Sequence, residues 1–440
     1  MFPEQVSTAN ILSAFIYVVS AVSVILVLIG LGLVDAGLVR KNNVLHCWVQ
    51  KITTCMIGGL ATFFVGDAIW QWQFYTAFGT PHPFLQAFID WWPGSAAMST
   101  PALAQDPKLV PGADTQQVFS VFFVTFAMAT VALIHSGTVE RIRSAPLYVM
   151  SLATGLIFCP LAAYLTWGPL SPLTNNGLHD FEGAVALYVF TGTWTLVTAW
   201  RMGPRAGVFI PDPEGVQPKP SNYGNIASGA LFVFMAIPLI ALGSTWITPG
   251  KTVYGITMVP TGLGIVLKNV FLALLGGGVS GAALAALLRE PVWVFFGPIA
   301  GAVMTGTVFD VAGSMESLAF GVIGPILAVI VSRALVHLRI DEPKVAPLAF
   351  GPGIVGSLVG GFLHWRTGTG GFTDLPAPYA LDHAHITPLF QLIGIITVIL
   401  LSAVPAYVIC RVFEATSGLR ISRECERNGM DVTYWGHDKD

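Results

Sequence analysis

Long apolar stretches, separated by shorter polar connections, dominate this chain. Each stretch contains about 20 or more predominantly apolar residues, the length that an α-helix needs to cross the hydrocarbon core of a bilayer. The pattern therefore predicts an all-α polytopic membrane protein with eleven transmembrane helices. The expected spans are roughly 9–34, 46–72, 116–138, 145–167, 182–202, 224–247, 258–288, 291–309, 316–336, 346–364 and 387–412.

A Pro-rich connection at residues 203–223 separates the first five spans from the six that follow. An odd number of spans in each half turns the second half over in the membrane, which is the geometry of an inverted repeat. We therefore expect a 5+5 inverted repeat plus one final helix. The expected boundaries are 1–412 for the transmembrane domain, about 1–203 and 224–364 for its halves, 387–412 for the final helix and 413–440 for a cytoplasmic tail.

The basic residues predict the orientation of these spans. Of the 21 Lys and Arg residues, 17 fall in the segments that lie on the same side as the C-terminal tail. The opposite side holds Lys108, Lys251 and Arg366, and Lys268 lies inside a span. Because short cytoplasmic loops are enriched in Lys and Arg, we expect the N-terminus outside and the C-terminus inside, in the cytoplasmic membrane.

Composition excludes several classes of protein. Apolar residues make up 54% of the chain and charged residues only 10%, which leaves no room for a separate soluble domain. The five cysteines lie in expected spans or in the tail, so neither a disulfide framework nor a metal site is indicated. We expect a protein that is not an enzyme, needs no cofactor and binds no nucleic acid.

Several short motifs occur in a fixed order along the chain. They are GLVRKNNVL (37–45), ERIR (140–143), Trp167-Gly168 followed by Asp180-Phe181, RIDEP (339–343) followed by GIVG (353–356), and the tail GLRISRECERNGMDVTYWG (418–436). Together they resemble the motifs of the ammonium transporter (Amt/Rh) family in order, spacing and expected topology. The resemblance extends over essentially the whole chain and implies a homotrimer with one pore per subunit.

The resemblance also implies a site that recruits ammonium at the outer mouth of the pore. The aromatic and hydroxyl positions of that site correspond to Phe126, Trp167 and Ser244. Aromatic faces attract a desolvating cation by roughly 1–2 kcal/mol. Asp180 matches a structural acid of the vestibule. From the residues alone, Phe126 and Ser244 could equally be packing residues and Trp167 an anchor at the membrane interface.

The chain departs from the family where the pore is normally lined by two histidines that share a proton. The first position falls on Tyr188 and the second on Ala349 or, counted from RIDEP, on Phe350. Ile240 stands where a second gating Phe is usual. A phenol with a pKa of about 10 is a poor proton relay near neutral pH, so any ammonium flux should be electroneutral or very slow.

Charges also occur at membrane positions where the family is normally uncharged. Such groups are expensive in a bilayer, so each is either functional or part of a structural ion pair. We expect Lys268 to pair with Asp67, Asp310 or Glu316. His135, well inside a span, is expected to be a packing residue rather than a proton carrier. The atypical charges are Asp35, Asp67, Lys268, Asp310 and Glu316.

These observations predict an ammonium or ammonia channel or transporter. Two alternatives stay open: a protein of the same fold that conducts another small amine or a neutral gas, and a non-conducting ammonium sensor that signals through its tail. Docking of a PII-type regulatory protein on the cytoplasmic face is a further expectation from the resemblance.

Overall fold

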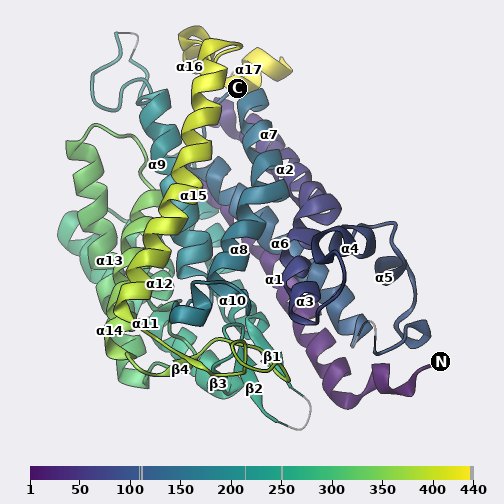
Figure 1. Ribbon diagram of the computed structural model, residues 1–440. Helices are drawn as coiled ribbons and strands as arrows, with labels where there is room; N and C mark the ends of the chain where they lie inside the picture. The colour runs from purple at the N-terminus through teal and green to yellow at the C-terminus, as the bar shows by residue number, and fades with distance from the viewer. Residues whose placement is uncertain (109, 111, 214, 249–250, 437–440) are drawn as a thin grey trace.

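Long helices run up and down through one bundle in the computed structural model (Figure 1), which describes residues 1–436 except 109, 111, 214 and 249–250. Two small sheets and the N-terminal end of the first helix lie at one end of the bundle, and the C-terminal tail lies at the other. We refer to these ends as the sheet side and the tail side.

Nine helical stretches of the described chain are long and apolar enough to cross a membrane. Three of them combine more than one helical segment. The nine are α1 (Thr8–Leu38), Lys41–Ala77 with α2 (Val44–Ala61) and α3 (Asp67–Ala77), α6 (Ala113–Ser136), Ser144–Trp167 with α7 (Ser144–Ala153) and α8 (Cys159–Trp167), α10 (Tyr223–Gly243), α11 (Leu263–Leu288), α13 (Ser314–His337), Ala346–Leu363 with α14 (Gly351–Leu363), and α15 (Pro388–Ala415).

Two of the eleven expected spans correspond to shorter helices. The expected span 182–202 contains α9 (Phe190–Met202), and the expected span 291–309 contains α12 (Val292–Thr305). The helical membrane fold is thus confirmed, whereas the count of eleven crossings and the inverted repeat stay predictions.

The connections carry more structure than the sequence pattern indicates. The segment 73–115, which connects the second and third expected spans, contains two short α-helices and a 3-10 turn among its described residues, and a three-stranded antiparallel sheet follows α10. A two-stranded sheet joins the segments on either side of residues 370–383. These elements are α4 (Pro83–Asp90), α5 (Ala96–Ser99), β1 (Thr245–Ile247), β2 (Val253–Gly255), β3 (Pro260–Thr261), β4 (Gly368–Thr369) and β5 (Ala384–His385).

Local sequence explains where several helices begin and how closely they pack. Ser7 and Thr387 accept hydrogen bonds from backbone amides in the first turns of α1 and α15, which satisfies donors that a helix start leaves free. Gly277 of α11 and Gly297 of α12 lie so close that a Cβ on either would collide with the carbonyl oxygen of the other. Small residues therefore set this helix contact, as is usual in membranes.

Two π-helical turns face each other in the middle of the bundle. One, Ala184–Val189, precedes α9, and the other, Ala346–Phe350, precedes α14. Gly192 has no side chain, and the backbone of Phe350 lies against it. Because a π turn carries an extra residue and is frequent at functional sites, these two turns mark the place to look for the site.

The C-terminal tail is docked on the tail side of the bundle through α16 (Arg423–Asn428) and α17 (Met430–Trp435). The Asp431 carboxylate accepts hydrogen bonds from the amides of Leu45 and His46, at 3.0 and 2.7 Å, and so caps the start of α2. The Tyr434 ring stacks on His46 with ring centroids 4.7 Å apart. The tail thus contacts the membrane domain directly.

Candidate functional site

A narrow cavity of about 100 Å³ lies between α1, α6, α10, α12 and the two π turns. It follows α1 from Val24 to Val34, which is about 15 Å at a rise of 1.5 Å per residue. Eighteen of its 21 lining residues are apolar, and the exceptions are Glu182, Tyr188 and Lys344. The cavity is therefore a mostly apolar space in the centre of the bundle.

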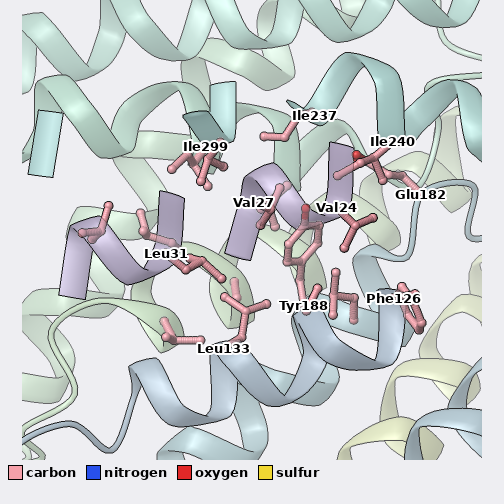
Figure 2. A pocket seen from close by; sticks show the side chains of 18 of the residues that line it. Val24, Val27, Leu31, Phe126, Leu133, Glu182, Tyr188, Ile237, Ile240 and Ile299 are labelled. Carbon is pink, nitrogen blue, oxygen red and sulfur yellow. The ribbon is translucent and has the colours of Figure 1, made fainter. Parts of the chain in front are cut away.

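Several residues singled out from the sequence line this cavity. Phe126 and Ile240 lie at its sheet-side end, with Leu31 and Leu133 at the other end and Tyr188 standing between them (Figure 2). Ala349 also lines it, from the second π turn.

The sequence leaves open whether Ala349 or Phe350 takes the position of the second pore histidine, and the structure distinguishes the two. Phe350 is not among the lining residues, because its backbone and Cβ pack against Gly192. Of the two positions, Ala349 is the one that lines the cavity together with Tyr188.

The aromatic pair expected to recruit a cation closes the sheet-side end. The rings of Phe126 and Trp167 are 5.0 Å apart, and Trp167 is only 6% exposed. Its indole N–H donates to the backbone carbonyl of Asp180, and the ring lies against Gly183, whose φ of +97° suits glycine. Trp167 is therefore fixed inside the protein.

Asp180 holds the first π turn in place. Its carboxylate accepts hydrogen bonds from the amides of Val185 and Ala186, at 3.1 and 2.9 Å. Burial raises the pKa of the Asp180 carboxyl to about 7, although these amide bonds oppose the shift. The geometry is that of a structural acid, since the carboxylate is directed at backbone.

Ser244 is hydrogen-bonded to a segment other than the aromatic pair. It follows the last residue of α10, one turn beyond Ile240, and its carbonyl accepts a hydrogen bond of 2.7 Å from the amide of Ile256. In the described part of the chain, no hydrogen bond connects it with Phe126 or Trp167. The structure brings Phe126 and Trp167 together, and the part that Ser244 plays in the recruitment site stays a prediction.

A buried ionic cluster ends the cavity on the tail side. Asp35 forms ion pairs with Lys344 and, at 2.6 Å, with Lys51, and it accepts a hydrogen bond of 2.8 Å from Ser136. All three charged residues are at most 5% exposed. Two ammonium groups thus surround one carboxylate.

This cluster corrects the charge count made from the sequence. Lys51 and Lys344 were assigned to the basic face of the membrane, but Lys51 lies within α2 and both side chains are directed inward to Asp35. Their partner lies on another helix, and that contact is invisible in a hydropathy pattern.

His135 lies beside the cluster, with Nδ1 3.6 Å from an Asp35 oxygen. It is fully buried, and neither ring nitrogen has a hydrogen bond among the described residues. Asp35, Cys47 and His135 could in principle supply three metal ligands, but Lys51 and Lys344 already occupy the carboxylate. This arrangement disfavours a metal ion there.

The remaining membrane carboxylates have other partners than the expected lysine. Asp67 accepts a hydrogen bond of 2.7 Å from Ser120, Asp310 contacts His179 at 3.0 Å, and Glu316 contacts His364 at 2.9 Å. Lys268 is exposed on α11, and no ion pair involves it within the described chain. The expected pairing of Lys268 was wrong, because each candidate acid has another side chain as its partner.

Sequence reasoning missed Glu182 as a site residue. It directly follows Asp180-Phe181, and its charge next to an expected span was the available signal. Lys344 could likewise have been noticed as the residue that follows RIDEP, but nothing in the sequence links it to Asp35.

Comparison with known proteins decides the family. The family model described as Ammonium Transporter Family matches residues 14–439. The chain belongs to the ammonium transporter family. It is therefore a multi-pass membrane protein of a transporter family, as the motifs predicted.

Relatives and solved structures agree with this family membership. Ammonium transporter Amt2 of Methanocaldococcus jannaschii is 27% identical over 431 residues, covering 96% of this chain and 90% of that protein. A putative ammonium transporter of Methanothermobacter thermautotrophicus is 25% identical, covering 96% of both. A structure described as a Sensor Amt Protein has a TM-score of 0.74 at 20% identity, covering 97% of this chain and 99% of that one. Candida albicans Mep2 has a TM-score of 0.70 at 20% identity, covering 96% and 88%.

Proposed function

We propose that this protein takes up ammonium at Phe126 and Trp167 and passes ammonia through the central cavity without a histidine relay. The cavity itself is the observation that carries the proposal. It has an aromatic pair at one end, an apolar wall and no histidine among its lining residues. Family membership supplies the substrate class.

The two ends of the cavity favour different species. An aromatic face attracts ammonium, whereas an apolar passage favours neutral ammonia because a charge is expensive to desolvate. At the tail-side end, two lysines flank one aspartate, so the cluster formally carries one excess positive charge. This charge repels a cation and leaves the neutral molecule unaffected.

Tyr188 supports electroneutral transport. It stands in the middle of the cavity, where its hydroxyl can donate to ammonia or water. A phenol with a pKa of about 10 does not exchange protons readily at neutral pH. The proton of ammonium therefore has no histidine carrier among the residues that line the cavity.

The proposal also includes the orientation, the oligomeric state and a regulatory partner. We place the N-terminus outside and the tail in the cytoplasm, with the protein as a homotrimer in the cytoplasmic membrane. A PII-type regulator would then meet the docked tail.

A second candidate function is a non-conducting ammonium sensor. It is favoured by the closed aromatic pair, the ionic cluster and the tail docked on α2, and by the structural likeness to a protein described as a Sensor Amt Protein. In that case ammonium binding would alter the tail without producing flux.

Flux and current measured together on purified protein in liposomes test the two functions. Ammonia flux without a sustained current on a solid-supported membrane supports the proposal. Saturable binding without flux supports the sensor, and flux of methylamine or carbon dioxide alone points to another substrate. A sustained ammonium current contradicts transport without a relay.

A further inference from the structure

Glu182 is held rigidly at the sheet-side end of the cavity. Its backbone N–H donates to the Gly306 carbonyl at 2.9 Å, and the preceding amide of Phe181 donates to Thr307 at 3.1 Å. The chain is thus tied to the turn after α12, while the Glu182 side chain lines the cavity near Ile240 (Figure 2). Its position does not depend on a flexible loop.

The Glu182 carboxylate has no partner. The residue is only 5% exposed, its Oε2 is enclosed without a hydrogen bond, and neither oxygen accepts one from the described residues. The other buried acids differ: Asp35 has two lysines, Asp180 has two amides and Asp341 has Arg205. An unpaired buried carboxylate is costly, so this place in the cavity lacks a positive partner.

No side chain of the cavity supplies that partner. Lys344 is the other charged residue of the lining, but it pairs with Asp35 near the opposite end. The nearer polar group is Tyr188, whose hydroxyl has no hydrogen bond in the described part of the chain and could accept one. One carboxylate and one phenol oxygen therefore face an otherwise apolar space.

The two oxygens and the small volume of the cavity limit which ligands can bind there. Calcium takes 6–8 oxygen ligands and magnesium keeps an octahedral shell, which two oxygens in an apolar cavity cannot replace. A volume of about 100 Å³ accommodates a few water-sized molecules. A small monovalent cation with hydrogen-bond donors fits best, because it can donate to both oxygens and contact the face of Phe126.

We propose that Glu182 and Tyr188 form a second ammonium site, inside the cavity and beyond the Phe126–Trp167 pair. This inference rests on the proposed function and deepens it. An ion that passes the aromatic pair is held by the carboxylate, while the lysine cluster at the other end opposes its further passage. The cavity then stores an ammonium ion between a negative and a positive end.

Isothermal titration of the purified full-length protein with ammonium chloride tests this site. Glu182→Gln keeps the shape of the side chain and removes its charge, and it should weaken ammonium affinity at least tenfold. Asp67→Asn is the matched control, because Asp67 is also a buried carboxylate with an unpartnered oxygen but does not line the cavity. Its affinity should stay within twofold of the parent protein.

The possible outcomes separate this inference from the proposed function. If the parent protein shows neither ammonium binding nor ammonia flux, the proposed function fails. If the parent binds and Glu182→Gln binds equally well, the second site is wrong while the proposed function stands. Tyr188→Phe removes one hydroxyl and should weaken binding severalfold. If Glu182→Gln does not purify as a monodisperse protein, Tyr188→Phe serves as the test. Unchanged ammonium affinity in Tyr188→Phe would then contradict the second site.

Discussion

At the scale of single residues, the sheet-side aromatic pair combines two roles. Trp167 contacts Phe126 and also donates a hydrogen bond to the Asp180 carbonyl, so it both presents a ring and holds the loop that carries Glu182. Substitutions of Trp167 have to separate the ring contact from the hydrogen bond. Two variants do so, one that removes both and one that keeps an aromatic ring.

We expect Trp167→Leu to weaken ammonium binding by about 1–2 kcal/mol, the loss of a desolvated cation–π contact. Trp167→Phe lacks the indole N–H but retains an aromatic face, so it should lose less affinity. Calorimetric titration of both variants, with size-exclusion profiles as the folding control, makes the comparison. Equal affinity in folded Trp167→Leu and parent protein would leave Trp167 as a packing residue.

Lys344→Met should make the tail-side end permeable to cations. Asp35 then keeps Lys51 alone, and the excess positive charge disappears. At an effective dielectric constant near 20 and a separation of about 8 Å, one charge contributes roughly 2 kcal/mol to the barrier. A sustained ammonium-evoked current should appear on a solid-supported membrane, at least tenfold above the signal of the parent protein, with the exposed Lys219→Met as control. If the current does not rise in a folded Lys344→Met variant, the barrier to cations lies elsewhere.

The motifs in the sequence place single residues along the chain, but they do not show tertiary contacts, and the roles assigned to the site residues stay predictions. Phe126, Tyr188, Ile240 and Ala349 line the cavity, as their positions relative to the motifs implied. The pairing of Asp35 with Lys344 joins residues 309 positions apart, and no local pattern records it. For the same reason Lys268 was given a partner that other side chains had already taken.

At the scale of elements, charged loops join the helix ends on the tail side. Arg205 contacts Asp341 at 2.9 Å and Glu140 at 3.0 Å, and Arg420 of the tail contacts Glu426 at 2.7 Å. Hydropathy predicted the long helices well, because membrane crossing constrains their length and composition. It did not predict π turns or tail docking, since both depend on specific contacts between distant segments.

The loop network should make stability depend on pH. Burial alone would raise the pKa of Asp341, but Arg205 and Arg141 outweigh it and hold that pKa well below its usual range. Because the folded pKa lies below the unfolded value of about 3.9, the stabilisation is present above that value and is lost as the pH falls through the folded pKa. Thermal unfolding of detergent-purified protein should therefore shift to lower temperature below about pH 4.

Asp341→Asn provides the control for this pH dependence. It should lower the unfolding temperature at pH 7 and flatten the decline in acid. A variant that retains the parent's full acid sensitivity would assign the effect to other carboxylates, of which Glu140 is the first to examine, because Arg205 also holds its pKa down against the effect of burial.

At the scale of the whole molecule, the apolar cavity and its two charged ends predict the electrical behaviour. The unmodified protein in liposomes should give no sustained ammonium current, because the cavity has no histidine relay among its lining residues and ends in excess positive charge. Current traces recorded in ammonium gradients, with empty liposomes as the baseline, measure this directly.

The ionic cluster also has a consequence for how the protein is made. Asp35 and Lys51 lie on neighbouring helices of the first half and can neutralise each other as soon as that hairpin enters the bilayer. Lys344 is synthesised about 300 residues later and finds its counter-charge only when the halves assemble. We therefore expect a separately expressed fragment 1–203 to accumulate in membranes by itself, and fragment 224–440 to be degraded unless the first is co-expressed. Immunoblots of the two fragments, alone and together, would reveal this asymmetry, and Lys344→Met in the second fragment should reduce its dependence on the first.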